Sequence, residues 1–306
     1  MFPITVCSIA LNHMPAEDAF KVIVAAGYKK VDVHEKVHLQ IFPDLCDPAT
    51  LKAAAEANGL QIANLATYAG GGVDGRRKAY ALEGWEVPNP ERFTELGFSS
   101  DDPRELKIEF EQLQRTIDLA VFFGARSIRV IPGNDQPETI DKIVPWFKRA
   151  AEYATEKKIY MSFENGFADL AGTPELCVEL VEKVGSPYFG IMYEPGNLFH
   201  DTGADYLAAL TTMKNHIIHC HFKDCKPVDD GYAFQHFGEG VIDFPLIMEQ
   251  LHAHGYEGQI ALEYELPTPR SEIDLRKYYE DFAALFTRNR ELRKKWKISQ
   301  EEIVPL

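Results

Sequence analysis

The sequence lacks both a CxxC pair and an uncharged apolar run of the roughly 18 residues that a membrane-spanning helix needs. Its cysteines are odd in number, and they are Cys7, Cys46, Cys177, Cys220 and Cys225. Such usage suits a reduced cytoplasmic interior better than a disulfide framework. The N-terminus also lacks a positive start followed by a long apolar segment, so we expect a soluble cytoplasmic protein with no membrane partner.

Basic residues are comparatively few, with 32 Lys and Arg against 47 Asp and Glu, which gives a net charge of −15. A protein that grips a nucleic-acid backbone needs clustered basic side chains to displace phosphate counterions. The balance therefore argues against a nucleic-acid partner and favours a small molecule. A hydrophobic content of 45% and a charged content of 26% are typical of globular proteins and exclude general disorder.

The most informative stretch is residues 217–224, Ile-Ile-His-Cys-His-Phe-Lys-Asp. An apolar, β-rich run that ends in an imidazole, a lysine and a carboxylate predicts a buried strand with chemistry at its C-terminal end. Because side chains alternate along a strand, His219 and His221 share one face while Cys220 and Phe222 take the other. Both histidines could equally be interior residues with satisfied hydrogen bonds. Only polar residues elsewhere in the chain can distinguish this interpretation from a functional site.

Apolar runs alternate regularly with segments of helical periodicity. The expected strands are residues 4–10, 30–34, 60–65, 126–131, 159–163, 188–193, 216–222 and 259–264. The expected helices are residues 15–26, 47–58, 100–123, 137–157, a segment opened by Thr173-Pro174, and residues 203–213, 244–254 and 273–287. Eight strand–helix units match the closure number of a TIM barrel, so we predict an α/β fold with a single (β/α)8 barrel domain.

The domain is expected to span residues 1–306, with the barrel in about 1–290 and a C-terminal helical extension in about 291–306 that could also serve a subunit contact in a homo-oligomer. Residues 68–100 interrupt the rhythm and are expected to form a long loop after the third strand, of the kind that serves as a lid or binding loop. A doubly wound open sheet would need a GxGxxG turn after an early strand, and Gly70-Gly71-Gly72 is not one.

Four consecutive predicted strands end in polar residues, at the barrel face where active sites lie. These residues are Glu164, Glu194, His221 and Glu263. Three crowded carboxylates repel unless a cation lies between them. A set of three Glu and one His suits Mn²⁺, Mg²⁺, Co²⁺ or Fe²⁺ better than the thiolate-rich set of structural Zn²⁺.

Each carboxylate also has an ordinary structural interpretation. Glu164 could begin a helix, Glu194 could be a turn residue before Pro-Gly, and Glu263 could be a salt-bridge partner. Four such accidents on consecutive strands would rarely coincide, so the sequence favours one divalent metal ion (Mn²⁺, Mg²⁺, Co²⁺, Fe²⁺ or Zn²⁺).

Motifs in the second half of the chain carry a family resemblance. They are Glu164-Asn165-Gly166, Pro195-Gly196-Asn197, the 219–224 stretch, Gly238-Glu239-Gly240 followed by Ile242-Asp243, and Gly255-Tyr256-Glu257-Gly258 leading to Glu263. In this order they resemble the xylose-isomerase-like superfamily of sugar isomerases and epimerases, whose fold is related to that of apurinic endonuclease family 2. The combination is specific to the superfamily, whereas each motif alone is weak.

The resemblance implies metal ligands at Glu164, Glu194, His221 and Glu263. It also implies that Glu164 and Glu263 act from opposite sides of the substrate as catalytic base and acid on an enediolate. The second ligand of such proteins is usually Asp. At Glu194 the longer side chain could still bind the metal, could shift it, or could leave it weakly held.

The implied function is a divalent-metal-dependent isomerase or epimerase of a small keto sugar or hydroxy-carbonyl compound, acting by proton transfer next to a carbonyl. The substrate would be a small sugar, polyol or keto acid. Lys223 could neutralise a developing oxyanion or be simply solvated. Further candidate substrate-binding residues are Asn197, His200, Arg129 and His34. Three aromatic residues of the long loop, Tyr68, Trp85 and Phe93, could stack on the sugar or simply pack.

Three alternatives remain open. A metal-dependent dehydratase of a cyclic polyol, keto-inositol or dehydroshikimate type would share the same metal site. A non-enzymatic sugar-binding or metal-binding barrel would retain the pocket without turnover, and the Glu at position 194 is its main support. A nuclease is disfavoured, because Tyr232 and Phe234 stand where the related endonucleases carry further metal ligands.

Overall fold

The computed structural model describes residues 4–35, 38, 47–81, 86–166, 169–229, 231–266 and 272–287. Among these residues, parallel strands close into a single barrel in the order β1-β2-β3-β4-β5-β6-β7-β10. The barrel strands are β1 (Ile4–Cys7), β2 (Lys30–His34), β3 (Gln61–Ala69), β4 (Ser127–Val130), β5 (Tyr160–Glu164), β6 (Phe189–Tyr193), β7 (Ile217–Phe222) and β10 (Ile260–Leu262). Closure is made by β1, in which Ile4 pairs with Ile260 and Val6 pairs with Val31.

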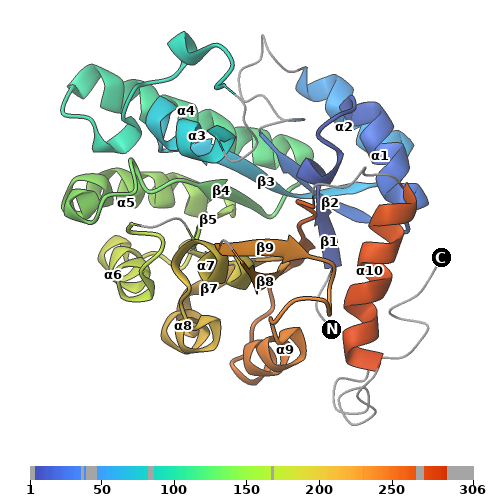
Figure 1. The fold of residues 1–306 in the computed structure, drawn as a ribbon. Helices are drawn as coiled ribbons and strands as arrows, with labels where there is room; N and C mark the ends of the chain where they lie inside the picture. Colours follow the sequence, from blue (N-terminus) through green and yellow to red (C-terminus); the bar gives the residue numbers. More distant parts are fainter. Residues whose placement is uncertain are drawn as a thin grey trace.

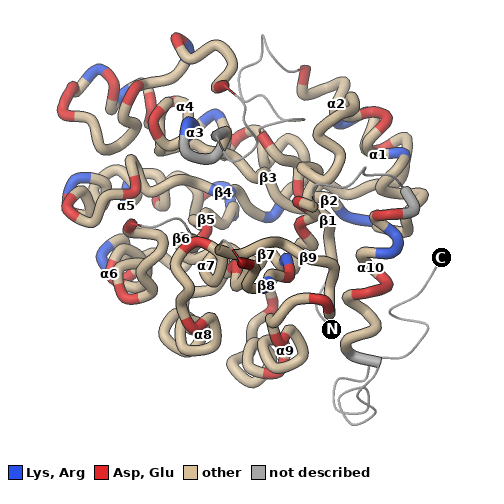
Figure 2. Tube along the Cα trace, viewed as in Figure 1, with Lys and Arg blue, Asp and Glu red and all other residues tan. Residues whose placement is uncertain are grey.

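Helices surround the strands on the outside of the barrel (Figure 1). They are α1 (Ala16–Ala25), α2 (Pro48–Ala57), α4 (Pro103–Phe123), α5 (Ile140–Lys157), α6 (Pro174–Val184), α8 (Tyr206–Met213), α9 (Phe244–Ala253) and α10 (Glu272–Thr287). The prediction of a (β/α)8 barrel is therefore confirmed. Acidic positions lie on these outer helices and also around the middle of the barrel near β5, β6 and β7 (Figure 2).

Local sequence signals place the helix ends. Asp47 and Asp102 cap α2 and α4 by accepting a hydrogen bond from the backbone N–H two residues on, and in each case a proline occupies the first turn. Gly124 ends α4 with φ of 71°, a conformation that glycine adopts at little cost.

The hydrophobic core lies between the strands and the helices. The Phe222 ring of β7 packs against Phe244 of α9 at a centroid distance of 5.1 Å, and Phe147 of α5 packs against Phe189 of β6 at 5.0 Å. Alternation along β7 places His219 and His221 on one face, as the sequence predicts, and in the structure this face points into the barrel. The inward face at this level is polar, because Thr5, Asp32 and His219 are all buried there.

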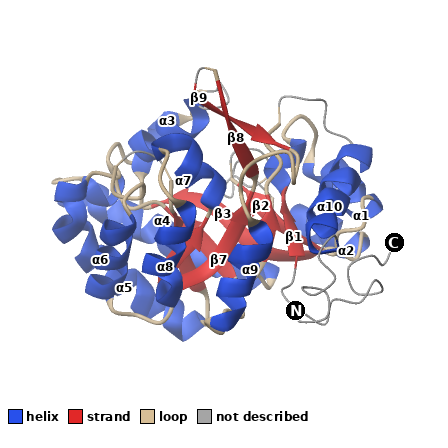
Figure 3. Ribbon diagram, turned by 60° about the horizontal axis from the view of Figure 1, so that its bottom comes forward, coloured by secondary structure: helices blue, strands red, loops and turns tan. Residues whose placement is uncertain are grey.

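Three further elements lie on the carboxyl side of the barrel strands (Figure 3). They are helix α3 (Gly72–Ala81), helix α7 (Pro195–Thr202) and an antiparallel hairpin of β8 (Asp224–Val228) and β9 (Gly231–Gln235). The segment expected to be a long loop after the third strand thus contains α3. It also holds the short 3-10 turns η2 (Pro90–Arg92) and η3 (Gly97–Ser99). Helix α7 and the hairpin were not predicted.

The hairpin is tied to the barrel through a single carboxylate. Asp224 Oδ1 accepts hydrogen bonds from the backbone N–H groups of Cys225 (2.9 Å) and Ile242 (3.2 Å). Its Oδ2 accepts hydrogen bonds from the N–H groups of Gly238 (2.9 Å) and Gly240 (3.1 Å). A Cβ at position 240 would lie 2.0 Å from Asp224 Oδ1, so only glycine fits at this point. The chain segments that enter and leave the β8–β9 hairpin therefore meet at the buried Asp224 carboxylate.

The predicted C-terminal extension, residues 291–306, lies outside the described residues, as do Trp85 and Cys46. Four cysteines are described, and all are buried free thiols, in keeping with the expectation of no disulfide framework: Cys7, Cys177, Cys220 and Cys225. No helix in the described ranges combines the length and the apolar character needed to cross a bilayer.

Candidate metal centre and active site

Four strands deliver the predicted ligands to one end of the barrel. Glu164 is the last residue of β5, Glu194 follows β6 directly, His221 lies in β7 and Glu263 follows β10 directly. All four are buried, with exposed fractions of 5% or less. The sequence argument about strand ends therefore places each residue correctly along its strand.

Three of the four side chains converge. One ligand atom from each of Glu164, His221 and Glu263 lies within 4.8 Å of the others. His221 Nδ1 is 3.6 Å from Glu164 Oε1 and 3.4 Å from Glu263 Oε1. This buried nitrogen has no hydrogen-bond partner among the described residues. A buried polar atom without a partner destabilises the fold unless a bound group, such as a metal ion, interacts with it. An inward set of two carboxylate oxygens and one imidazole nitrogen fits a divalent ion that prefers oxygen and nitrogen ligands.

The second oxygen of each glutamate is held by a buried cation. Arg129 Nη1 donates to Glu164 Oε2 at 2.6 Å, and Lys223 Nζ donates to Glu263 Oε2 at 2.8 Å. Lys223 also donates to Glu265. Burial alone would raise the pKa of Glu263, but Lys223 and His221 hold it well below its usual value. Each glutamate is thus anchored by one oxygen and presents the other to the centre.

An aspartate orients His221 from behind. Asp32 Oδ2 lies 3.2 Å from His221 Nε2 and 2.6 Å from His219 Nε2, and its Oδ1 accepts a hydrogen bond from Thr5 Oγ1 at 2.9 Å. A proton on Nε2 facing Asp32 leaves the Nδ1 lone pair directed at the two glutamates, as a metal-binding histidine requires.

The same contacts shift the acid–base behaviour of this pair. Burial would raise the pKa of Asp32, but His219 and His221 lower it well below its usual value. For His221, burial would lower the pKa, but Glu263 and Asp32 raise it to about 10. Sequence reasoning missed Asp32. The available signal was an acidic residue inside the apolar strand Val31-Asp32-Val33.

Glu194 is the one predicted ligand that the structure does not bring into this group. Its Oε1 accepts hydrogen bonds from the N–H groups of Gly196 (3.0 Å) and Lys223 (3.2 Å), and its Oε2 accepts one from the N–H of Asn197. The side chain therefore caps α7, where backbone N–H groups are unpaired and attract a carboxylate. Burial raises the pKa of Glu194 to about 8, although Lys223 acts in the opposite direction.

Four of the five predicted substrate-binding residues lie beside the centre. Lys223 and Arg129 hold the two glutamates, and Asn197 Nδ2 donates to Glu164 Oε1 at 3.3 Å. His34 Nε2 lies 3.0 Å from Arg129 Nη2. His200 differs, because its half-buried ring stacks on Phe234 of the hairpin at 4.7 Å.

The aromatic residues expected in the long loop have separate roles. Tyr68 is buried at the end of β3, with its hydroxyl 3.4 Å from His34 Nε2. Phe93 lies 3.8 Å from the Arg76 guanidinium, which also forms a buried ion pair with Glu35 at 2.8 Å. Tyr68 thus belongs to the wall of the site, whereas Phe93 packs against a structural cation.

A closed barrel of parallel strands with helices outside it and acidic and imidazole side chains at the carboxyl ends of its strands is an α/β TIM barrel of the kind that carries active sites there. The sequence pattern of the xylose isomerase-like TIM barrel family matches residues 20–286. The chain belongs to this family, as the sequence motifs predicted.

Two curated relatives have names that describe sugar or polyol chemistry. An inosose dehydratase of Geobacillus thermodenitrificans is 28% identical over 143 residues, which cover 42% of this chain and 48% of that protein. The putative L-ribulose-5-phosphate 3-epimerase UlaE of Shigella dysenteriae serotype 1 is 26% identical over 174 residues, which cover 55% and 59%. The matches therefore span about half the length of these relatives.

A solved structure supports the fold over nearly the whole chain. The crystal structure of a xylose isomerase-like TIM barrel protein from Mycobacterium smegmatis, in complex with magnesium, superposes with a TM-score of 0.69. The match covers 94% of this chain and 97% of that one at 16% sequence identity. Related proteins of this fold thus include one solved with a divalent ion and others named as epimerases and dehydratases.

Proposed function

We propose that this protein is a divalent-metal-dependent isomerase or epimerase that moves a proton next to the carbonyl of a small keto sugar or hydroxy-carbonyl compound. The observation that carries the proposal is the pair Glu164 and Glu263, which face the unpaired His221 Nδ1 at 3.6 and 3.4 Å. Two carboxylates on either side of one centre can take a proton from one face of a carbon and return it to the other.

Glu164, His221 and Glu263 would hold the metal ion, and when bound it would act as a Lewis acid toward the carbonyl and hydroxyl oxygens of the substrate. Asp32 would keep the His221 Nδ1 lone pair directed at the centre. Glu194 either stays on the α7 backbone or turns into the centre as a fourth ligand, and the geometry of its three backbone hydrogen bonds favours the first arrangement.

Two buried cations, Arg129 and Lys223, assist the proposed proton transfer. Arg129 and Lys223 keep one oxygen of each glutamate fixed, which holds both carboxylates in place at the centre where the substrate would bind. Because Lys223 is buried and cationic, it also stabilises negative charge that develops on a substrate oxygen near Glu263. Burial would lower the pKa of Lys223, but Glu263 and Glu265 raise it well above its usual value, so the side chain stays charged at neutral pH.

The test is solvent exchange. The protein loaded with Mn²⁺, Mg²⁺ or Co²⁺ is incubated in D₂O with a panel of ketoses and keto-inositols, and deuterium uptake at the carbon next to the carbonyl is followed by NMR. We expect uptake by the wild type and a loss of about 10²-fold or more for Glu164→Gln and Glu263→Gln. Glu175→Gln, on the exposed surface of α6, is the matched control. If the wild type shows no deuterium exchange with any compound tested, the proposed function is wrong.

A dehydratase of a cyclic polyol is the second candidate, because a relative with 28% identity is named as an inosose dehydratase. Proton removal by Glu164 or Glu263 would then be followed by departure of a hydroxyl, with Lys223 near the leaving oxygen. The same incubation separates the two reactions. An epimerase returns an isomer that differs in mass from the substrate only by the deuterium taken up, whereas a dehydratase yields a product that has lost one water.

A further inference from the structure

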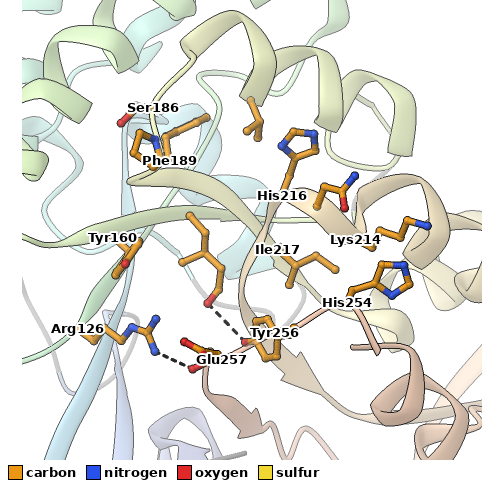
Figure 4. Close-up of a pocket in the computed structure, with 16 residues that line it drawn as sticks. Arg126, Tyr160, Ser186, Phe189, Lys214, His216, Ile217, His254, Tyr256 and Glu257 are labelled. Carbon is orange, nitrogen blue, oxygen red and sulfur yellow. Dashed lines mark hydrogen bonds between the residues drawn. The ribbon is translucent and has the colours of Figure 1, made fainter. Parts of the chain in front are cut away.

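A cavity of about 430 Å³ opens at the amino ends of the strands, on the face of the barrel opposite the metal centre. Its lining comes from residues that precede or begin β4, β5, β6, β7 and β10 (Figure 4). The volume is within the range of small-molecule sites. The motif Gly255-Tyr256-Glu257-Gly258 lines the cavity, and the proposed reaction gives the cavity no role.

Three aromatic rings are among the residues that line the cavity, and irregular backbone forms part of its wall. Its rings come from Tyr160, Phe189 and Tyr256. The pairing of β6 with β7 slips by one residue at Ile218, which creates a bulge under the cavity. A Cβ at Gly258 would lie 2.3 Å from the Tyr256 ring and 2.4 Å from the Ile218 carbonyl oxygen, so the close approach depends on glycine.

The rim is basic, although the chain as a whole carries a net charge of −15. Arg126, Lys214, His216 and His254 surround the opening, and Glu257 is the acidic residue that lines it. Lys214 forms no ion pair within the described part of the chain, and His216 is only loosely paired with Glu182, at 3.8 Å. Among the residues that line the cavity, two permanent cations, Arg126 and Lys214, stand against one carboxylate, Glu257, so the lining is slightly positive although the chain is acidic.

Arg126 is held in place before any ligand arrives. Its guanidinium lies 5.0 Å from the centroid of the Tyr160 ring, which itself stacks on Tyr188 at 4.8 Å. Nη1 donates to the Glu257 carbonyl oxygen at 3.0 Å, and the remaining guanidinium N–H groups make no hydrogen bond to a described residue. A guanidinium fixed in this way presents its donors in a fork suited to a carboxylate.

We propose that this cavity is a second ligand site that binds a small organic carboxylate with an aromatic or apolar body. The body would lie against the half-buried rings of Tyr160 and Tyr256, and the carboxylate would face Arg126 and Lys214. The site is separate from the metal centre and does not depend on the proposed reaction.

Benzoate is the probe, and inorganic phosphate is the comparison that carries charge without an aromatic ring. In calorimetric or NMR titrations of the full chain we expect benzoate to bind with a dissociation constant of about 1–10 mM, as suits so small a ligand. Phosphate should bind more weakly. Phosphate binding as tight as benzoate binding, or no benzoate binding in that range, would overturn the proposal.

Single substitutions test which side chains bind benzoate. Arg126→Gln should weaken benzoate binding about tenfold or abolish it, and Lys214→Gln should weaken it less. Arg115→Gln removes an equal charge from the exposed face of α4 and should leave binding unchanged. Arg126 and Lys214 are not buried, so both variants should keep the melting temperature of the wild type. Equal effects of Arg126→Gln and Arg115→Gln would contradict a specific site.

A crystal soaked with 4-bromobenzoate gives an independent readout, because the anomalous signal of bromine marks its position. Bromine beside Tyr160 and Tyr256 supports the proposal. Bromine in the barrel mouth near Arg129, or no ordered bromine, overturns it.

Discussion

The carboxylates at the ends of the neighbouring strands β5 and β6 lie in different regions of the site. Glu164 presents one oxygen to His221 in the central group, whereas Glu194 gives both oxygens to backbone N–H groups at the start of α7. The difference comes from the residues after each strand. Asn165-Gly166 continues as irregular chain after β5, but Pro195 begins a helix at once, and the unpaired N–H groups of that helix capture the carboxylate. A strand end brings a side chain to the active-site face, and the next residues decide what it binds.

The largest expected effect comes from the central group. Glu263→Gln should lower Mn²⁺ affinity well over 100-fold, because even outer partners of a metal site typically contribute about 10–100-fold. Competition with a chromophoric chelator measures the affinity. Glu265→Gln is the control, since Glu265 also contacts Lys223 but lies outside the group of converging ligands. Equal affinities for Glu263→Gln and the wild type would show that the central group does not bind metal.

The pH dependence of metal binding should be nearly as large. In the metal-free protein His221 has a pKa of about 10, so it is protonated at neutral pH and must lose that proton to bind a metal ion. Because the proton competes with the metal, Mn²⁺ affinity should rise with pH, by up to about tenfold per unit between pH 6 and 8. Calorimetry in buffers of different ionisation enthalpy should detect about one proton released per ion bound. A flat pH profile would mean that His221 is not a ligand.

Asp32→Asn should have an intermediate effect. The substitution keeps the size of the side chain but removes the charge that orients His221, so Mn²⁺ affinity should fall about 10–100-fold. Thr5→Val removes only the hydrogen bond to the other oxygen of Asp32 and should change the affinity by less than about threefold. If Asp32→Asn binds Mn²⁺ as the wild type does, Asp32 has no positioning role.

The smallest expected effect on metal binding is that of Glu194→Gln, and this variant tests the comparison most directly. Metal affinity should change less than about threefold, and the free energy of unfolding should fall by about 1 kcal/mol through the weakened helix cap. Asp205→Asn weakens the cap of α8, away from the centre, and gives the matching loss of stability. A fall in affinity as large as that of Glu263→Gln would show that Glu194 leaves α7 and joins the metal.

The sequence predicted those features that depend on local periodicity. The barrel strands, most helix starts and the shared face of His219 and His221 can be derived from alternation, capping residues and glycine stops. Helix α7 was missed because Pro195-Gly196-Asn197 favours a turn when it is taken alone. The hairpin was missed because β8 contains Pro227 and its residues toward the turn are exposed, so no apolar pattern marks it.

Contacts between distant segments could not be read from the sequence. Asp32 meets His219 and His221 across the barrel at a sequence separation of 187 and 189 residues. The amino-end cavity depends on a one-residue slip between β6 and β7, which leaves no mark in composition or periodicity. The contacts of Glu194 could not be predicted because the sequence did not reveal that helix α7 begins at the next residue. The first two features depend on how the barrel closes, whereas the position of the Glu194 side chain depends on the helix that follows it.

The Asp224 carboxylate that gathers four backbone N–H groups has a consequence for protein engineering. Both ends of the β8–β9 hairpin are fixed at that residue. The turn of the hairpin can therefore be lengthened or exchanged without shifting β7 or α9. Libraries that vary the hairpin between its anchored ends would therefore change the mouth of the barrel while the barrel itself stays the same.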